Sequence, residues 1–397
     1  MNARRFLIGL AAYAALVVAS PRSFGLTTNS VGLVLYTAFD GTSYTLKPWF
    51  GQNVAVLTPN STSYQSNVMA QVISALDQAY TYYGRAMGRQ PALFDSTVLE
   101  GRDTIAVVNS TCGAGCSYVG FTGTEILNQY FQVLYNGVAA ANQFDQVLFY
   151  EFGRNFWFYG NELDYQSPDV DPVGTGFAVY MRFMSMSAIG VAGGPYNGTP
   201  FPAFAGAVTN LIDSYVLSSG LNWSNTFRLS TAPANSLGLG GTDLIASLLM
   251  RIGRDFGGTN FPSDFWHQAK LLSSAQSSQQ AADNFVLTAC AATHENLTHI
   301  FATTWKWPVS AAASQQAQTR WGNPAQFPAH YFVQNAGNNS LKLSWQSEAG
   351  VYYQRQESLD LQTWTNVGAP ILGNGSVRSV FTPDNLSPQR FFRLQAQ

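Results

Sequence analysis

Charged residues, and lysine above all, are scarce in this sequence. Only 11% of its 397 residues are charged, and the basic residues, 20 in number, are slightly outnumbered by 22 acidic ones. Lysine occurs only at Lys47, Lys270, Lys306 and Lys342. Without a basic patch, nucleic acid and anionic membranes are poor partners, and we expect neither. The abundance of neutral polar residues suits an extracellular surface.

Long apolar runs are also lacking, apart from one near the N-terminus. Arg4 and Arg5 precede an apolar stretch at residues 6–19, and small and turn-forming residues follow it. This three-part pattern predicts a secretory signal peptide over residues 1–25. The run is shorter than the roughly 20 residues that span a bilayer, although an uncleaved membrane anchor stays an alternative. We therefore expect a secreted or cell-surface protein that has no membrane contact after cleavage.

The sequence has only three cysteines. Cys112 and Cys116 flank a glycine-containing loop and are close enough to form a small disulfide in an oxidising compartment. Cys290 lies in an apolar helical pattern and is expected to be a buried free thiol.

Residues 26–309 predict a first domain of α+β class. Short apolar stretches indicate strands at 52–58, 104–108 and 118–124. Apolar residues at helical spacing predict helices that start near Ser66 and cover 145–159 and 176–187, the first of them ended by Gly88. From residue 208 onward the pattern is almost entirely helical. A small mixed sheet with helices should thus be followed by a helical subdomain.

The end of the chain has a different character. Residues 310–329 are rich in Ala, Ser, Gln and Pro, which predicts a linker. Residues 330–397 contain short strand patterns separated by turn residues, which is typical of a small β-sandwich. The segments Tyr353–Ser358 and Trp364–Val367 also resemble the C-terminal sandwich modules of secreted bacterial proteins.

The most informative segment is Phe-Tyr-Glu-Phe-Gly-Arg-Asn-Phe at residues 149–156. It resembles the active-site helix of zinc metallopeptidases of the zincin class. There, two histidines four residues apart hold zinc, and the Glu beside the first is the general base. In this sequence Tyr150 and Arg154 stand at the histidine positions, and only Glu151 matches.

Two further segments resemble the gluzincin branch of the same class. In Val-Gly-Thr-Gly-Phe-Ala-Val-Tyr at residues 173–180, the end of the segment matches a helix whose Glu completes the zinc site. Thr175 replaces that Glu, and Tyr180 matches. Residues 295–310 resemble the end of gluzincin-like helical subdomains. The resemblance implies a zincin-like fold for most of residues 26–310, whereas an ordinary amphipathic helix at 145–159 is the alternative.

The departures from the motif decide the expected chemistry. Arginine cannot be deprotonated in a protein, tyrosine binds metal only as phenolate, and threonine is a poor zinc ligand. We therefore expect neither a metal nor another cofactor. The candidates for the cleft are Tyr150, Glu151, Arg154, Thr175, Tyr180 and Glu125, and Glu151 is the candidate catalytic residue if the protein is active. We also expect Arg154 to pair with Glu151 in place of the metal.

Three functions remain open from the sequence. The first is a secreted pseudopeptidase that binds an extracellular peptide, protein or glycan without zinc-dependent cleavage. The second is a secreted hydrolase, acting on peptides or glycans, that uses Glu151 in a non-classical site or the acidic residues between 162 and 171. The third is a structural protein of the cell surface.

The zinc ligands provide the first testable prediction. Purified mature protein should contain no stoichiometric zinc, because Tyr150, Arg154 and Thr175 offer no suitable ligand set. Elemental analysis measures this directly. One zinc per chain that disappears in Glu151→Ala would contradict the pseudopeptidase hypothesis.

Overall fold

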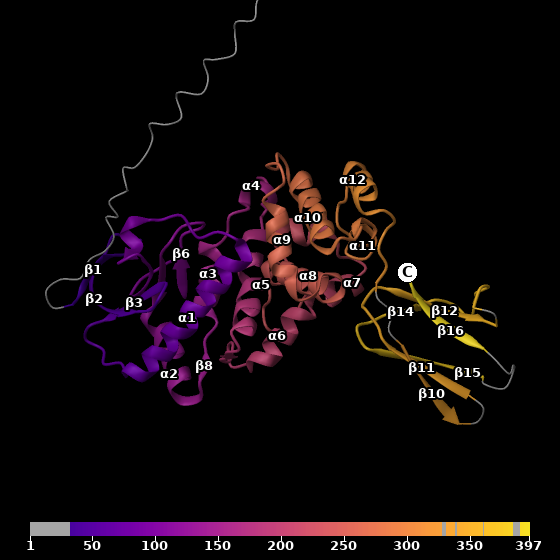
Figure 1. Ribbon diagram of the computed structural model, residues 1–397, viewed down its shortest axis with the longest axis horizontal. Coiled ribbons are helices and arrows are strands. Elements are labelled where there is room, and N and C mark those ends of the chain that lie inside the picture. Colours follow the sequence, from indigo (N-terminus) through magenta and orange to yellow (C-terminus); the bar gives the residue numbers. More distant parts are fainter. Residues whose placement is uncertain (1–31, 328–330, 338–339, 360, 384–389) are drawn as a thin grey trace, which may run out of the picture.

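The computed structural model describes residues 32–327, 331–337, 340–359, 361–383 and 390–397 (Figure 1). The predicted signal peptide, residues 1–25, lies outside the described residues and stays a prediction. In the part of the chain that is described, no helix combines the length and the apolar character needed to cross a membrane.

The N-terminal region is built on a mixed sheet of seven strands. The order is β1-β2-β3-β5-β7-β6, with β4 paired to β5. Strands β3, β5 and β7 are parallel, and the other pairs are antiparallel. The strands are β1 Val34–Thr37, β2 Ser43–Phe50, β3 Val54–Pro59, β4 Val98–Leu99, β5 Arg102–Val108, β6 Gly115–Ser117 and β7 Thr124–Leu127. Strand β6 ends the order, so it forms one edge of the sheet.

The strand that we predicted at residues 118–124 is wrong. Strand β6 has already ended at Ser117, and the chain turns before β7 begins at Thr124. Gly120 and Gly123 have φ values of 79° and 109° in this turn, which side chains with a Cβ rarely adopt. The apparent alternation of apolar and polar residues belongs to a hairpin connection.

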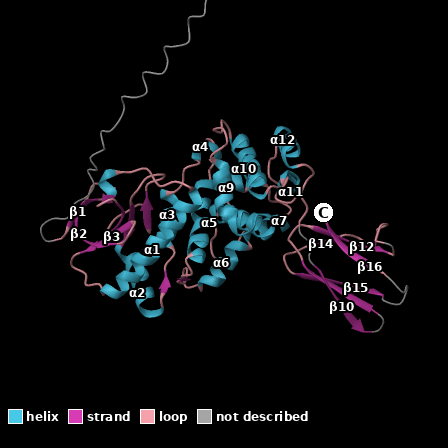
Figure 2. Ribbon diagram, viewed as in Figure 1, coloured by secondary structure: helices cyan, strands magenta, loops and turns pink. Residues whose placement is uncertain are grey.

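Helices α1 to α5 and several short elements accompany this sheet, and Figure 2 shows the helices in cyan. Helix α1 ends at Gly88, whose left-handed φ of 65° agrees with the predicted C-cap. The helices are α1 Ser66–Met87, α2 Asn128–Ala141, α3 Val147–Asn155, α4 Gly160–Leu163 and α5 Val173–Ala188. The short elements are the 3-10 helix η1 Asp95–Thr97 and the strand pair β8 Gln143–Phe144 and β9 Ala192–Gly193. Helix α5 packs against α3 on one side and α8 of the helical subdomain on the other.

The next part of the chain is helical, as the sequence predicts. Its helices are α6 Phe201–Thr209, α7 Leu211–Leu217, α8 Gly241–Ile252, α9 Phe261–Ala269, α10 Ser278–Thr293, α11 Thr298–Thr303 and α12 Ala311–Trp321. Four short helical turns are η2 Trp223–Asn225, η3 Phe227–Leu229, η4 Gly253–Gly257 and η5 Gly258–Asn260.

Helix α12 lies within the range that we expected to be a linker, 310–329. Ser310 caps it by accepting a hydrogen bond from the Ala313 amide at 3.1 Å, and Ala313 and Ala317 are buried. It packs on α10 and α11. Most of the expected linker is therefore a helix of the helical subdomain. Its alanines, which we interpreted as linker composition, are also strong helix formers.

The C-terminal region is rich in β-structure. One sheet has the order β10-β11-β15, and in the other β12 pairs with β13, β14 and β16. The strands are β10 Tyr331–Gly337, β11 Ser340–Gln346, β12 Tyr352–Ser358, β13 Thr365–Asn366, β14 Ile371–Leu372, β15 Val377–Pro383 and β16 Phe391–Ala396. Trp345 of the first sheet lies beside Tyr353 of the second, with ring centroids 5.7 Å apart.

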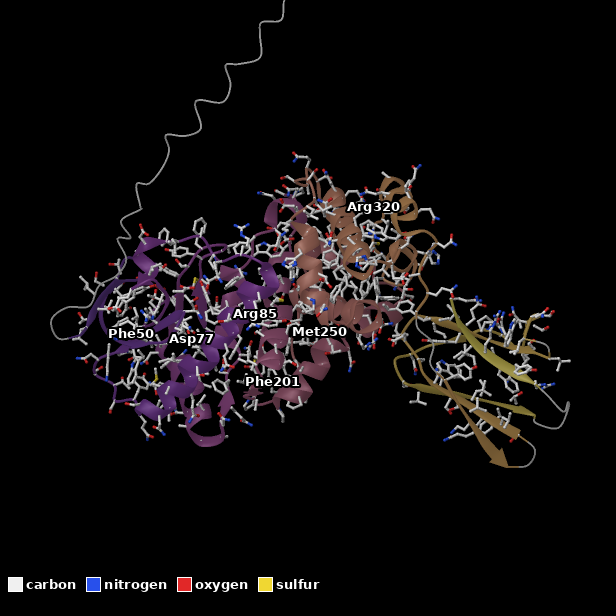
Figure 3. All side chains as sticks on the ribbon, in the orientation of Figure 1. Phe50, Asp77, Arg85, Phe201, Met250 and Arg320 are labelled. Atoms are coloured by element: carbon white, nitrogen blue, oxygen red, sulfur yellow. A yellow bond between two sulfur atoms is a disulfide. The ribbon has the colours of Figure 1, made fainter. Side chains whose placement is uncertain are left out.

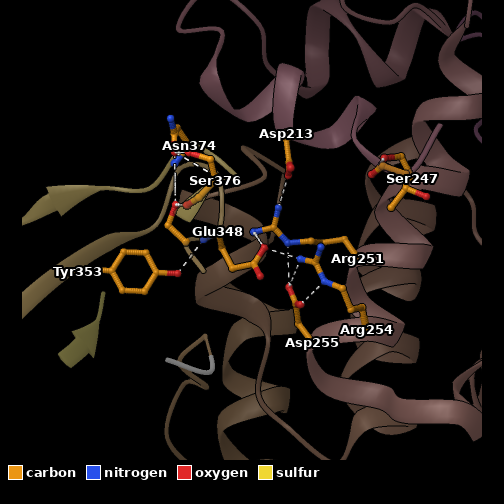
Figure 4. A network of polar contacts seen from close by, with 11 residues as sticks. Asp213, Ser247, Arg251, Arg254, Asp255, Glu348, Tyr353, Asn374 and Ser376 are labelled. Atoms are coloured by element: carbon orange, nitrogen blue, oxygen red, sulfur yellow. Dashed lines mark hydrogen bonds and ion pairs between the residues drawn. The ribbon is translucent and has the colours of Figure 1, made fainter. Parts of the chain in front are cut away.

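A buried arginine joins this C-terminal region to the helical subdomain (Figure 4). The Arg251 side chain is 1% exposed, and Glu348 reaches it from the C-terminal region at 3.0 Å. Asp213 and Asp255 pair with the same guanidinium at 2.5 and 2.8 Å. Gly350 lies so close to Val216 that a Cβ there would clash. The interface is therefore packed as well as ion-paired.

This network predicts the effect of removing the more buried of its two arginines. Arg251→Met should lower the free energy of unfolding by roughly 3–5 kcal/mol, because Asp213 would lose its ion-pair partner, and Asp255 and Glu348 would keep only the half-exposed Arg254. Denaturant unfolding monitored by tryptophan fluorescence measures the change. Arg320→Met on the exposed face of α12 (Figure 3) is the matched control, with an expected change within about 0.5 kcal/mol. Equal effects of the two substitutions would contradict the ion-paired interface.

Candidate functional site

A cavity of about 390 Å³ lies between the cysteine loop and helices α3 and α5. Three of the residues predicted for the cleft, Tyr150, Glu151 and Arg154, line it. The remaining lining is Cys112, Gly113, Ala114, Gly115, Cys116, Ser117, Gln146, Val147, Arg182 and Tyr196. This volume is in the range of cavities that take small ligands or a few side chains.

Glu151 forms part of the buried wall of this cavity. It is 5% exposed, and a Cβ placed on Gly115 of β6 would come within 2.9 Å of its Cγ and Oε1 atoms. Burial raises the pKa of Glu151 to about 7, whereas a hydrogen bond with Ser117 and the charge of Arg154 act in the opposite direction. The carboxyl group is therefore divided between its protonated and ionised forms near neutral pH.

Arg154 does not form the ion pair with Glu151 that we expected. Its Nη1 donates to the Thr175 hydroxyl at 2.6 Å, and no carboxylate in the described part of the chain lies within 4.0 Å of its guanidinium. Glu151 instead contacts Gly115 and forms a hydrogen bond with Ser117. The charge of Arg154 nevertheless acts on Glu151 and Tyr150, because it lowers the pKa of both groups against the larger effect of burial.

The position of Arg154 follows from the close approach of α3 and α5. A Cβ on Gly153 would come within 2.5 Å of the Ala178 Cα, so only glycine allows the two backbones to approach this closely. This crossing brings the predicted motif at 149–156 next to the one at 173–180. Thr175, on the first turn of α5, can therefore accept a hydrogen bond from Arg154.

Asn155 fixes the end of α3 under the β6–β7 hairpin. It is fully buried, and its side-chain amide donates to the carbonyl oxygens of Phe121 and Gly123 at 2.7 and 3.0 Å. Its Oδ1 accepts a hydrogen bond from the Thr124 hydroxyl at 2.9 Å. Sequence reasoning noted this asparagine only as part of the motif, although its position after the second histidine site was a signal of its role.

The residues at the three ligand positions of the zincin motif do not fit zinc. Tyr150, Arg154 and Thr175 lie around one point of the fold, but they offer a phenol, a guanidinium and a hydroxyl. Among the described residues, no group of three or more His, Cys, Asp or Glu side chains is placed to hold a metal ion.

Two of the other predicted cleft residues lie away from the cavity. Tyr180 is 2% exposed in the core, where burial raises the pKa of its phenol far above the usual value. Glu125 is fully buried and accepts hydrogen bonds from Tyr36 Oη at 3.0 Å, the Phe39 amide at 2.7 Å and the Thr111 hydroxyl at 3.0 Å. Through its hydrogen bond with Thr111, Glu125 therefore fixes the start of the cysteine loop.

The cysteine loop forms the rim of the cavity. Cys112 and Cys116 are joined by a disulfide, and their Cα atoms are 5.5 Å apart. Both line the cavity. Cys290 is a buried free thiol in α10, where burial raises its pKa to about 12. The disulfide fixes the loop next to strand β6.

Sequence reasoning missed Arg182, a second arginine in the cavity lining. It is 6% exposed, donates to Gln146 Oε1 and lies 3.6 Å from Asp243. Its Nε has no hydrogen-bond partner among the described residues. Burial lowers its pKa, although the charge of Asp243 acts against this effect. An arginine within the apolar run of the predicted helix at 176–187 was the signal that could have identified it.

Strand β6 is the outermost strand of the sheet beside this cavity, but its edge is covered at the buried Gly115, whose carbonyl oxygen lies 3.7 Å from Cys112 Sγ. The Ala114 carbonyl oxygen accepts a hydrogen bond from Leu127 of β7, the Tyr118 amide donates to Gly123 just before β7, and Cys116 is paired with Glu125. In an antiparallel ladder the intervening residues, Gly115 and Ser117, direct their N–H and C=O groups away from the partner strand. Glu151 packs against Gly115 where a Cβ atom would project. That position lies on a face of the sheet and not at its edge.

A pair of acidic side chains, Asp164 and Asp171, lies in the segment between α4 and α5. Burial first, and then the charge of Asp171, raises the pKa of Asp164 well above its usual range. Asp171 accepts hydrogen bonds from the amides of Tyr165 at 3.0 Å, Val173 at 3.1 Å and Gly174 at 3.2 Å. Asp171 is therefore the carboxyl group that ionises more readily, and Asp164 is the one that keeps the proton that the pair shares. Asp171 alone accepts hydrogen bonds from amides of the first turn of α5.

A larger cavity of about 620 Å³ lies elsewhere, between α1, the end of α5 and the start of α9. Asp77 and Arg85 of α1 contribute to its wall (Figure 3). The Asp77 carboxylate has its own structural partners, because it accepts hydrogen bonds from the amides of Gln52, Asn53 and Val54. This cavity contains none of the predicted site residues.

No protein-family profile matches the chain, and no curated protein matches its sequence. Among solved structures, it is similar to a conserved protein of unknown function from Bacillus anthracis, with a TM-score of 0.49 and 10% identity; the match covers 70% of this chain and 52% of the other. It is also similar to the ZmpB metallopeptidase from Clostridium perfringens, with a TM-score of 0.45 and 12% identity over 90% of this chain and 68% of that one. The chain thus spans about half of the Bacillus anthracis protein.

A third similarity is to aminopeptidase A from Legionella pneumophila, solved in complex with aspartic acid. Its TM-score is 0.37 at 9% identity, and it covers 91% of this chain and 36% of that chain. At these TM-scores, none of the similarities decides what the chain does.

The buried carboxyl groups predict how stability depends on pH. The folded-state pKa of Asp164 is raised, so the stability that this group contributes is complete below its unfolded value of about 4 and is lost as the pH rises through the folded value. Asp164→Asn is neutral at every pH and can donate permanently to Asp171. The free energy of unfolding of the variant, relative to that of the unmodified protein, should therefore increase as the pH rises from about 5 to 8. Urea unfolding across this range measures the difference, and a constant difference would contradict the shared proton.

Proposed function

We propose that this protein is a secreted, zincin-like pseudopeptidase that binds an extended peptide in the cavity beside β6. The observation that carries the proposal is the outer edge of β6, next to a cavity whose zinc-ligand positions hold Tyr150, Arg154 and Thr175. An extended peptide can add a strand to such an edge, because its own N–H and C=O groups complete the ladder.

A peptide is favoured over a glycan by the nature of the edge. Ser117 directs its backbone donor and acceptor away from β7 at the outer edge of the sheet, a pattern that a polypeptide matches and a sugar chain does not. The disulfide between Cys112 and Cys116 stabilises the loop that leads into this edge. The surface is therefore largely formed before a ligand binds, which reduces the entropic cost of binding.

The second candidate is a hydrolase that uses Glu151 without zinc. It is favoured by one observation, the pKa of about 7 that burial gives to this cavity-lining carboxyl group. Such a value suits a general base or acid near neutral pH. The candidate lacks a second group of matched function, because Tyr150 keeps a pKa raised by burial and Arg154 cannot take up a proton.

One experiment separates these candidates. The mature protein is incubated with a panel of extended peptides and a panel of oligosaccharides, and binding and product formation are measured with and without a chelator. We expect peptide binding without products, unchanged by the chelator. Glu151→Gln is the matched variant, since it keeps the shape of the side chain and removes its acid–base function.

The outcomes are distinct. Turnover of a peptide or oligosaccharide that is lost in Glu151→Gln would overturn the pseudopeptidase proposal in favour of the hydrolase. Binding of oligosaccharides but not of peptides would overturn the choice of ligand class. Binding of neither would leave no support for a cleft function and would favour a structural role at the cell surface.

A further inference from the structure

The cavity beside β6 contains two arginine side chains and one acidic side chain. Arg154 and Arg182 both line it, and Glu151 is the acid. The lining therefore carries two positive charges against at most one negative charge. The cavity is therefore cationic.

Arg154 has unused hydrogen-bonding capacity. A guanidinium carries five N–H donors in a planar fork, and the contacts of Arg154 to Thr175 and Tyr150 use only part of it. No carboxylate of the described chain lies within 4.0 Å to neutralise it. It is also only half-buried, so that a ligand can reach it.

Arg182 strengthens the same field from a more buried position. It is 6% exposed, its Nε lacks a hydrogen-bond partner among the described residues, Asp243 lies 3.6 Å from its guanidinium, and its charge also lowers the pKa of Asp145. Gln146 accepts from its Nη1 and thereby fixes the guanidinium next to the Tyr150 ring, whose centroid lies 6.0 Å from Cζ. A buried cation of this kind favours an anion in the adjoining space.

We propose that the cavity recognises a carboxylate on the bound peptide, with Arg154 as the group that binds it and Arg182 as a second, buried positive charge. This inference rests on the proposed peptide-binding function and adds the chemistry of the ligand. The planar carboxylate matches the guanidinium fork with two parallel hydrogen bonds. The carboxylate comes either from an acidic side chain or from the C-terminus of the peptide.

Four synthetic pentapeptides test the proposal on the full mature protein. All four are acetylated at the N-terminus. The first pair has an amidated C-terminus and carries either Glu or Gln at the centre of an alanine sequence. The second pair consists of alanine only, and one member has a free C-terminus while the other is amidated. Affinity is measured by calorimetry. The Nε–H signals of the arginines are followed by NMR, with that of Arg154 assigned by its absence in Arg154→Gln.

We expect at least one carboxylate-bearing peptide to bind about tenfold or more tightly than its neutral counterpart and to shift the Arg154 signal, since hydrogen bonds to charged groups are the stronger kind. The advantage should disappear in Arg154→Gln. The Glu peptide and the free C-terminus distinguish the two sources of the carboxylate. Arg154→Lys keeps the charge but not the fork, so it should retain an intermediate preference and serves if Arg154→Gln does not fold.

Arg85→Gln is the matched control, because this arginine is also on a helix and lines a cavity, but not the one beside β6. It should keep the full preference. If neutral and acidic peptides bind equally, or if the preference survives in Arg154→Gln, carboxylate recognition is overturned while peptide binding stands. If no peptide binds up to roughly 5 mM, the proposed function itself fails, because this concentration already corresponds to very weak binding.

Discussion

The site depends on one packing constraint, the close crossing of α3 over α5 at Gly153 and Ala178. A side chain at Gly153 would collide with the backbone of α5, so the crossing distance is set by the absence of a Cβ. From this contact follow the hydrogen bond from Arg154 to Thr175 and the burial of Glu151 against β6. Asn155 then ties the same helix to the hairpin above it. Helix α3 thus positions Arg154, the wall of the cavity and its contact with strand β6.

The electrostatics of the site follow from this arrangement. A carboxyl group held against Gly115 loses hydration and gains a proton more readily, whereas the nearby guanidinium keeps its charge at every relevant pH. In the zincin motif that the sequence resembles, a metal ion would supply the positive charge. Here Arg154 supplies it, but by proximity and not by the direct pair with Glu151 that we expected; its Nη1 donates to the Thr175 hydroxyl.

The sequence predicted the α+β class, the long helix ended by Gly88 and the cleft residues on α3, since these depend on local periodicity and on a motif. It did not predict β6 or the helical state of 311–321, because short edge strands and alanine-rich segments are decided by tertiary contacts. Arg182 was missed for the same reason, and Tyr180, which the helical spacing places on the inward face, was also assigned to the cleft although it lies in the core. Helical spacing identifies the apolar stripe, but the neighbour of each side chain depends on the packing of α5 against α8.

The proposed function depends on the pairing of a peptide with the outer edge of β6 beside Arg154. Hydrogen–deuterium exchange with and without an acidic peptide measures this pairing, because it protects amides that face the ligand strand. Exchange should become slower in the segment that contains Gly115 and Ser117, with little change along α1 beside the larger cavity. Protection along α1 with none at Gly115 and Ser117 would contradict this pairing.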